Sequence, residues 1–291
     1  MKINNIDLER VNVLIDLALT EDLSDIGDTT SKSVIPEDTM AVAVLRCKED
    51  LVCAGLPVAE HVFKKVCPDV KWTPLVKEGD FCKAFTALAE VSGRAQDLLT
   101  AERTALNFLQ RLCGVATCSR QYADALKGSN TKVLDTRKTT PGWRNLEKYA
   151  VETGGSANHR IGLYDRVMIK DNHRELAGLE GGKGIVRSVA RAREMYSSLE
   201  VEVEADTLEE VAEAIEAKAD YILLDNMTNE EMCEAVKMNK GRCKLEASGG
   251  ITIERLPAIG KTGVDFVSVG ALTHSVKASD ISMEIKLSGK E

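Results

Sequence analysis

Hydrophobic residues follow two different rhythms along this chain, and the rhythm changes near residue 115. Residues 7–20 carry apolar side chains at helical spacing, and so do residues 96–112, where leucine and alanine form one stripe. Between these helices, residues 40–55 carry apolar and β-branched residues at every second position, which is typical of strands. This mixture predicts a small α/β domain over residues 1–115.

Beyond residue 115, short apolar segments alternate with helical segments of about ten to fifteen residues. The apolar segments, each followed at once by polar residues, are 132–135, 166–169, 200–203, 221–224, 244–247 and 266–269. Strand–helix units repeated in one direction predict a parallel sheet, and six of them favour an α/β barrel over residues 116–275. An open, doubly wound sheet has a similar strand count and is the alternative.

Two helices of this second region have marked starts. Asp206 with Glu209, and Thr228 with Glu231, have the spacing of a capping box. In that motif the cap side chain and the third helical residue satisfy free backbone N–H groups. We therefore expect helices to begin immediately after residues 206 and 228.

Composition excludes several classes of protein. Of the 291 residues, 44% are hydrophobic and 29% charged, as in an ordinary globular protein. A net charge of −8 disfavours a polyanion binder, and 4% aromatic residues disfavour a stacking surface for single-stranded nucleic acid, so we expect no nucleic-acid partner. No apolar run approaches the roughly 18 residues of a membrane span, and the N-terminal residues do not have the pattern of a signal peptide. The eight cysteines include no C-x-x-C pair, so we expect reduced thiols and a cytoplasmic location.

The residues that follow the predicted strands define a candidate site. In an α/β barrel the carboxyl ends of all strands meet at one face, which carries the chemistry. Here that face would hold residues 135–138, Lys170 with Asp171, Glu204, Asp225 with Asn226, Ser248 to Gly250, and Gly270. Such a ring is basic on one side and rich in carboxylates on the other.

Positive charge is concentrated between residues 137 and 170. This segment contains seven basic and three acidic residues, although the chain as a whole is acidic. Arg137, Lys138 and Lys170 adjoin strands, where arginine and lysine hold carboxylates or phosphates. Arg144 and Lys148 lie four residues apart and fit the solvated face of a helix instead.

Two glycine-containing loops predict a phosphate site. Ser248, Gly249 and Gly250 lie between a strand and a helix, and Gly270 occupies the same place one unit later, with His274 just beyond. Late barrel loops that open onto helix N-termini commonly bind phosphate, although tight turns alone would also require glycine.

Acidic residues and one histidine complete the candidate set. Glu204 and Asp225 follow neighbouring strands and could accept ribose hydroxyls or bind Mg²⁺ through water, with Asp171 as a third candidate. His159, next to Arg160 in the basic segment, is the histidine that we expect to bind substrate.

Several segments together carry a family resemblance. Residues 136–173 (TRKTTPGWRNLEKYAVETGGSANHRIGLYDRVMIKDNH) closely resemble the quinolinate phosphoribosyltransferase family. Residues 21–31, 101–117 and 222–226 and the two glycine loops extend the likeness, in order, over nearly the whole chain. The resemblance implies a type II phosphoribosyltransferase fold. This fold has an N-terminal α/β sandwich domain, to which a C-terminal helix over residues 276–291 returns, and an open α/β barrel.

The resemblance also implies an activity and roles for individual residues. The expected reaction joins quinolinate to phosphoribosyl pyrophosphate and gives nicotinate mononucleotide, pyrophosphate and carbon dioxide, with Mg²⁺ as cofactor. The implied substrate-binding and catalytic residues are Arg137, Lys138, Thr139, His159, Arg160, Lys170, Ser248, Gly249, Gly250, Gly270 and His274. Glu204 and Asp225 would lie near the ribose and the metal, with Glu202 as the alternative to Glu204. Arg103 would reach the partner's site in a homodimer or a higher oligomer.

Three alternatives remain at this point. A related family associated with molybdenum transport has the same fold and would lack part of the dicarboxylate-binding set. A Schiff-base aldolase would use Lys138 or Lys170 as its nucleophile. A non-catalytic anion-binding module is disfavoured by the net charge.

Overall fold

The computed structural model describes residues 6–179 and 183–288, which form two compact units. The sheet unit takes the chain up to Arg120 together with Thr139–Gly155 and the segment from Leu272 onward. The barrel unit comprises Gln121–Lys138 and Ser156–Ala271. The predicted limits after residues 115 and 275 lie close to two of these boundaries, but the prediction placed Thr139–Gly155 in the barrel.

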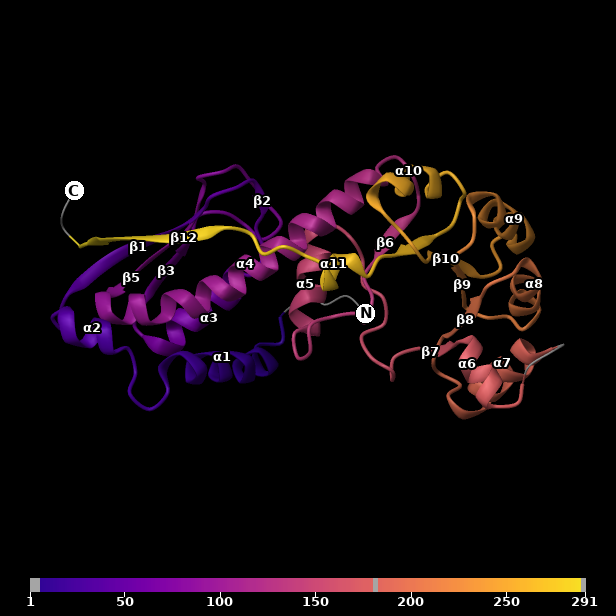
Figure 1. Ribbon diagram of the computed structural model, residues 1–291, viewed down its shortest axis with the longest axis horizontal. Helices are drawn as coiled ribbons and strands as arrows, with labels where there is room; N and C mark the ends of the chain where they lie inside the picture. Colours follow the sequence, from indigo (N-terminus) through magenta and orange to yellow (C-terminus); the bar gives the residue numbers. More distant parts are fainter. Residues whose placement is uncertain (1–5, 180–182, 289–291) are drawn as a thin grey trace. The chain divides into compact units, whose positions relative to one another are not determined.

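The sheet unit is built on a four-stranded antiparallel sheet. Its strand order is β12-β1-β5-β3, with β1 Met40–Cys47, β3 Lys71–Pro74, β5 Ala87–Arg94 and β12 Ile281–Leu287. Alternate residues of β1 are buried, so one face of the sheet contributes to a core. Figure 1 shows the helices of this unit on one side of the sheet; they include α1 (Leu8–Leu23), α3 (Leu56–Val66) and α4 (Ala95–Ala125). The smaller elements are α2 (Thr29–Val34), α11 (Ala271–His274) and the paired strands β2 (Leu51–Val52) and β4 (Phe81–Cys82).

The C-terminal segment returns to this unit as a strand, so the helix predicted over residues 276–291 is wrong within the described residues; residues 289–291 lie outside them. Strand β12 pairs with β1 over seven residues, from Ala41 opposite Leu287 to Cys47 opposite Ile281. Its apolar residues Ile281, Met283, Ile285 and Leu287 alternate with polar ones, which is the periodicity of a strand rather than a helix.

Helix α5 (Arg144–Gly154) belongs to the sheet unit because it packs on α4. The Ser119 hydroxyl donates to Val151 O at 2.6 Å, and Arg111 Nη2 lies 2.7 Å from Glu147 Oε1. Lys148 is 0% exposed, so the predicted solvated face is wrong at this residue. Helical spacing predicted the helix itself. It could not show that none of its residues is fully exposed.

The barrel unit contains six parallel strands, at the six predicted places. They are β6 (Lys132–Leu134), β7 (Val167–Ile169), β8 (Val201–Ala205), β9 (Tyr221–Asp225), β10 (Lys244–Ser248) and β11 (Phe266–Ser268). Their order is β6-β11-β10-β9-β8-β7, so from β7 to β11 each strand pairs with its successor along the chain. The order never reverses as it does in a doubly wound sheet, and β6 closes onto β11 as in a barrel.

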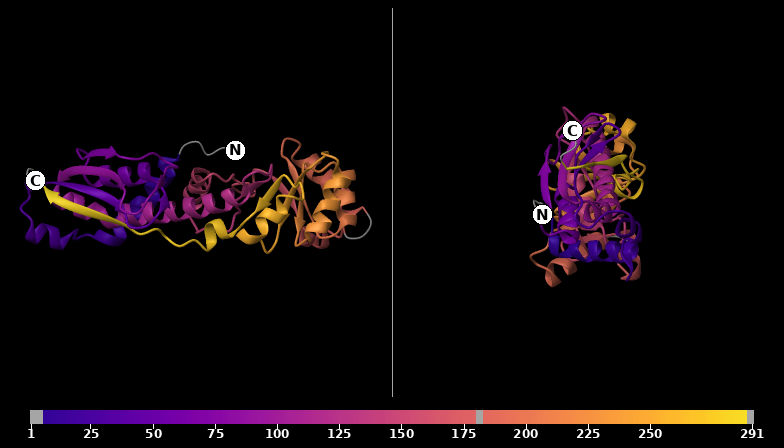
Figure 2. Two further views of the ribbon diagram at one scale, coloured as in Figure 1. Left: turned by 90° about the horizontal axis from the view of Figure 1, so that it is seen from above. Right: turned by 90° about the vertical axis from the view of Figure 1, so that its left-hand side faces the viewer.

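The barrel is open on one side. Among the described residues, β6 and β7 do not pair with each other. A single parallel bridge joins Leu134 of β6 to Ala157, so the segment around Ala157 lies along this open edge. The helices are α6 (Asp171–Leu176), α7 (Gly184–Met195), α8 (Leu208–Glu216), α9 (Asn229–Asn239) and α10 (Leu256–Ile259), with the 3₁₀ turn η1 (Ile253–Arg255). Figures 1 and 2 show α7, α8 and α9 around the outside of the strands.

The helix starts differ by one residue at one of the two predicted caps. Thr228 and Glu231 form the full capping box, as predicted. Asp206 is not a cap, because Thr207 accepts the hydrogen bond from Glu210 N at the start of α8. All eight cysteines are free thiols, as expected. In the described part of the chain, no helix has the length and apolar character that crossing a membrane requires.

Candidate active site

Four neighbouring strands bring predicted site residues to the same end of the barrel. Lys170 follows β7, Glu204 lies on β8, and Asp225 and Ser248 end β9 and β10 directly opposite each other. Lys170 Nζ lies 2.5 Å from Glu204 Oε2, so an ion pair joins the ends of β7 and β8. Because parallel strands end at the same side of the sheet, the basic and acidic parts of the candidate site meet at this ion pair.

The loop after β10 requires glycine for its own geometry. Gly249 has a φ of +91°, and a Cβ there would lie 2.1 Å from Asn226 Oδ1. Gly250 has a φ of +56°, and Arg255 Nη1 donates to its carbonyl oxygen at 2.8 Å. These constraints explain both glycines without a ligand, so phosphate binding here, and at Gly270 after β11, stays a prediction.

Two arginines concentrate positive charge at the open side of the barrel. Arg137 follows β6, and Arg160 lies in the segment that runs beside it. Burial lowers the pKa of Arg160, and the positive charge of Arg137 lowers it further. Two like charges held close together favour an anion between or beside them.

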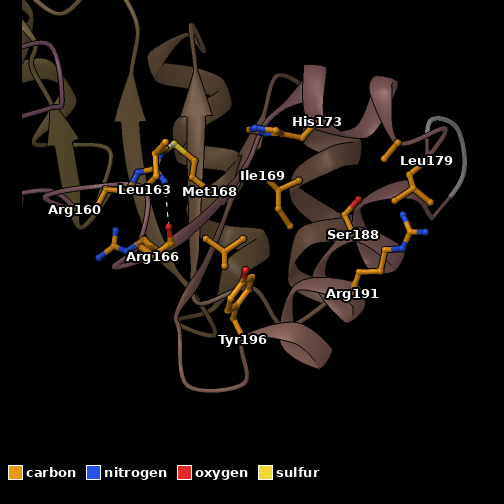
Figure 3. A pocket seen from close by; sticks show the side chains of 12 residues that line it. Arg160, Leu163, Arg166, Met168, Ile169, His173, Leu179, Ser188, Arg191 and Tyr196 are labelled. Carbon is orange, nitrogen blue, oxygen red and sulfur yellow. Dashed lines mark hydrogen bonds between the residues drawn. The ribbon is translucent and has the colours of Figure 1, made fainter.

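A hollow lies next to this basic cluster, along β7. It has a volume of about 380 Å³ and is lined by Arg160, Leu163, Arg166, Val167, Met168, Ile169, His173, Ala177, Leu179, Ser188, Arg191 and Tyr196. Figure 3 shows Arg160 beside Met168 and Arg166; its Nη1 donates to Arg166 O at 3.1 Å. The Arg160 guanidinium is therefore held by β7 and the residue that precedes it.

His159 is buried, with both ring nitrogens directed at the protein. Its Nε2 lies 3.3 Å from Glu202 Oε2 and 3.5 Å from Glu246 Oε2. Burial acts to lower the pKa of His159, but the two carboxylates outweigh it and raise the pKa to about 9. Against this, Arg160 N lies 2.6 Å from Nδ1 and donates to it, and that contact requires an unprotonated nitrogen. Two N–H groups facing each other at that distance would repel, so Nδ1 carries no proton and the ring proton is on Nε2.

Glu246 and Arg166 were not expected in the site from the sequence, and Glu202 was expected there only as the alternative to Glu204. Arg166 Nη1 lies 3.3 Å from Glu202 Oε2, and its guanidinium stacks on Tyr221 at 3.8 Å from the ring centroid. Burial favours the neutral form of Glu202, but His159 and Arg166 together lower its pKa. Both glutamates are 0% exposed. In the sequence, each of these two glutamates is a charged residue within a strand whose other residues are mainly those of a buried core.

Carboxylates gather around the ends of β8 and β9. The pKa of Asp206 is raised by burial and by the negative charges of Glu210, Asp225 and Asp171. Together with Glu204, these acids form the carboxylate-rich side expected from the sequence. Mg²⁺ usually takes one or two protein carboxylates and completes its shell with water and substrate phosphates, so the chemistry of this donor set fits a magnesium ion.

The remaining predicted residues are divided between the units. Lys138 belongs to the barrel unit, where its amide donates to Thr136 Oγ1 at 3.0 Å. Three belong to the sheet unit: Arg103 is exposed on α4, Thr139 Oγ1 accepts from Arg144 Nε at 3.1 Å, and His274 Nδ1 lies 2.6 Å from Ser275 Oγ.

The fold and the geometry of its strand ends define a class of protein. It is an open parallel α/β barrel, joined to an antiparallel sheet unit, with a cluster of basic side chains and a set of carboxylates at the carboxyl ends of its strands.

Comparison with known families makes this class specific. Residues 28–113 match the quinolinate phosphoribosyl transferase N-terminal domain, and residues 115–284 match the C-terminal domain. The chain belongs to the quinolinate phosphoribosyltransferase family.

Individual relatives are similar over most of their length. The chain is 42% identical to the chloroplastic nicotinate-nucleotide pyrophosphorylase [carboxylating] of Arabidopsis thaliana, over 94% of this chain and 82% of the relative. It is also 42% identical to the probable nicotinate-nucleotide pyrophosphorylase [carboxylating] of Bacillus subtilis, over 91% of this chain and 90% of the relative. Among solved structures, the nicotinate-nucleotide pyrophosphorylase of Francisella tularensis matches with a TM-score of 0.91 and 38% identity, over 98% of this chain and 99% of that one.

Proposed function

We propose that this chain transfers the phosphoribosyl group of phosphoribosyl pyrophosphate to quinolinate and releases the 2-carboxylate as carbon dioxide. The products are nicotinate mononucleotide, pyrophosphate and carbon dioxide, so the enzyme is a carboxylating nicotinate-nucleotide diphosphorylase of NAD biosynthesis. Family membership supports this reaction over the molybdenum-transport-associated alternative.

One observation carries the proposal: the barrel unit holds a paired-arginine cluster beside a carboxylate set, with the Lys170–Glu204 ion pair at their boundary. Quinolinate has two adjacent carboxylates, and arginine binds carboxylates by a planar two-point contact. We assign Arg137, Arg160, Lys138 and Lys170 to the carboxylates and phosphates. The ribose carries hydroxyl groups and develops positive charge, so we assign Glu204 and Asp225 to it.

The chemistry follows from these assignments. The quinolinate nitrogen attacks ribose C1 as the bond from C1 to pyrophosphate breaks, through a state in which the sugar is cationic. Carboxylates at the strand ends stabilise that charge, and lysine and arginine stabilise the departing phosphates. The ring nitrogen is then positively charged, so it stabilises the electron pair left at C2 when the bond to the 2-carboxylate breaks. A proton taken up at C2 completes the reaction.

Magnesium would be held by Asp225 and Glu204, directly or through water, together with the substrate phosphates. When bound, the ion neutralises negative charge on the departing pyrophosphate. Glu204 has a second role in this assignment, because its carboxylate also holds Lys170 in place.

A Schiff-base aldolase fits the site less well. Its lysine nucleophile needs a free lone pair to attack a carbonyl carbon. Lys170 Nζ is instead engaged by Glu204 at 2.5 Å, which suits a fixed cation.

An assay with quinolinate, phosphoribosyl pyrophosphate and Mg²⁺ tests the proposal, with nicotinic acid as the competing acceptor. We expect nicotinate mononucleotide from quinolinate and little from nicotinic acid, which has only one carboxylate. Absence of product from quinolinate would exclude the reaction. Equal use of both acceptors would exclude dicarboxylate recognition.

A further inference from the structure

A chain of contacts runs through the barrel interior to the Arg160 main chain. Asp135, 0% exposed, accepts the His159 amide at 2.8 Å, and His159 Nδ1 in turn accepts the Arg160 amide at 2.6 Å. On the other side of the ring, Nε2 faces Glu202 and Glu246. His159 therefore connects Asp135, the residue after β6, and strands β8 and β10 to the peptide that carries Arg160.

The Arg160 side chain is fixed by the same group of residues. Its Nη1 donates to the carbonyl oxygen of Arg166, whose own guanidinium bridges to Glu202 at 3.3 Å. The contacts thus form a closed circuit from Arg160 through His159, Glu202 and Arg166 and back to Arg160. Both the backbone and the guanidinium of Arg160 depend on it.

Glu246 is the most informative member of this circuit. It is 0% exposed, its Oε2 lies 3.5 Å from His159 Nε2, and neither of its oxygens accepts a hydrogen bond from the residues that the structure describes. A buried carboxylate with so little compensation is unfavourable for stability. Its place beside Nε2 suits a role in orienting the imidazole.

The same three side chains could be taken for a metal site, since ligand atoms of His159, Glu202 and Glu246 all lie within 4.8 Å of one another. The imidazole argues otherwise. A histidine that binds metal through Nε2 carries its proton on Nδ1 and donates from it, whereas here Nδ1 accepts the Arg160 amide.

We propose that His159, Glu202 and Glu246 are positioning residues: the buried carboxylates orient the His159 ring, and the ring holds the Arg160 peptide so that its guanidinium meets a substrate carboxylate. This inference rests on the proposed function for the identity of that carboxylate. It changes the role expected for His159, which acts through Arg160 and not by touching substrate.

Glu246→Met and Glu246→Gln form a matched pair for the test. Methionine keeps the approximate volume and removes the polar atom that faces Nε2, whereas glutamine keeps an oxygen at that place. We expect Glu246→Met to raise KM for quinolinate by about ten- to a hundredfold, as expected for a misplaced binding group, while KM for phosphoribosyl pyrophosphate stays near wild type. Glu246→Gln should restore quinolinate KM to near the wild-type value.

Binding of phthalate, measured by calorimetry, provides a readout independent of turnover. Phthalate keeps two adjacent carboxylates and lacks the reacting nitrogen, so its affinity should fall in parallel with the rise in quinolinate KM. An unchanged quinolinate KM and phthalate affinity in folded Glu246→Met would overturn the proposal. The proposal would also be overturned if KM for quinolinate and KM for phosphoribosyl pyrophosphate rose equally, and to the same extent in Glu246→Met and Glu246→Gln.

A second pair keeps the test decisive if Glu246→Met does not fold. His159→Asn retains an oxygen near the position of Nδ1 that can accept the Arg160 amide, and His159→Leu does not. Positioning predicts tighter phthalate binding by His159→Asn than by His159→Leu, whereas equal loss in both would indicate direct contact of the imidazole with substrate and overturn the proposal. A wild-type protein that neither converts quinolinate nor binds phthalate would instead overturn the proposed function itself.

Discussion

Arg137 and Arg160 place two guanidinium groups close together at the open side of the barrel. This arrangement explains why the candidate site favours an anion. Their mutual repulsion contributes to the lowered pKa of Arg160. An anion that bridges them would relieve the repulsion, which favours anion binding at this place. Lys138, exposed in the same loop, adds a third positive charge.

Replacing Lys138 by alanine tests that third charge. We expect Lys138→Ala to lower kcat/KM by about a hundredfold or more, because a positive charge that stabilises the transition state is lost. The melting temperature should remain near wild type, since this side chain is exposed.

Lys132→Ala is the matched control for that variant. Lys132 is an exposed lysine at the first residue of β6, whereas Lys138 lies beyond the last, so Lys132→Ala should keep wild-type kinetics. Near-normal turnover by purified Lys138→Ala would remove Lys138 from the site.

For single residues, the sequence predicted where a side chain lies along a strand. It did not predict how deeply that side chain is buried. Period-two alternation puts Glu202 and Glu204 on one face of β8, which the sequence alone can show. Which of them meets Lys170 and which is buried against His159 depends on neighbouring strands. His159 and Glu246 lie 87 residues apart in the sequence, so no local pattern could join them.

At the scale of elements, the six barrel strands were predictable because each has its own apolar run and its own terminating polar residues. Strand β12 was missed because the resemblance implied a helix there, although its residues alternate as in a strand, and its partner β1 lies at the opposite end of the chain. Seven alternating residues without a local hairpin partner become a strand only through that distant pairing. The misplaced cap at Asp206 shows a similar limit, since Thr207 is an equally good cap one residue later.

The start of α2 gives a prediction about pH. Asp28 Oδ1 accepts from Ser31 N at 2.9 Å, and this hydrogen bonding, first of all from Ser31, lowers the pKa of Asp28. Asp28→Ala should therefore lower the free energy of unfolding by about 1 kcal/mol at neutral pH. A lowered folded-state pKa stabilises the protein above the unfolded value of about 3.9 and ceases to do so as the pH falls through the folded-state value.

Urea denaturation of Asp28→Ala and the wild type at a series of pH values checks this dependence. The difference between them should shrink as the pH falls below about 4. Asp28→Asn keeps a capping oxygen that does not titrate, and its stability relative to alanine should not vary with pH in this way. A difference between wild type and Asp28→Ala that persists undiminished in acid would contradict the assigned role of the carboxylate.

Helix α4 contains a glycine that permits close packing of the chain's C-terminal segment. A Cβ at Gly114 would lie 2.2 Å from Lys277 O, and backbone cannot move as easily as a side chain. Gly114→Ala should lower the free energy of unfolding by about 2 kcal/mol or more, despite the better helix propensity of alanine.

The control for Gly114→Ala is Gln121→Ala, an exposed position on the same helix, which should change the stability by no more than about 0.5 kcal/mol. Denaturation by urea measures both variants. Stabilisation by Gly114→Ala would show that propensity outweighs the contact and that the segment near Lys277 can move away.

The whole molecule combines an acidic average with a concentrated basic segment. A net charge of −8 disfavours a general attraction for polyanions, whereas residues 137–170 carry a local excess of basic side chains. Small, multiply charged anions are the ligands that such a distribution selects. Arg103 lies outside this segment, on the sheet unit, and the family resemblance implies that it reaches the site of a second copy of the chain.

Subunit complementation tests whether Arg103 acts in a partner's site. Arg103→Ala and Lys138→Ala should each be nearly inactive alone. If Arg103 is donated across a dimer, a mixed dimer has one site that lacks both side chains and one site that is intact. Co-expression with random pairing should then recover about a quarter of wild-type activity, from half of the dimers with one working site each. Mixing two preparations of Lys138→Ala is the control and should recover nothing. If Arg103 instead serves the site of its own chain, every site in the mixture has one defect, and activity stays at the level of the separate variants.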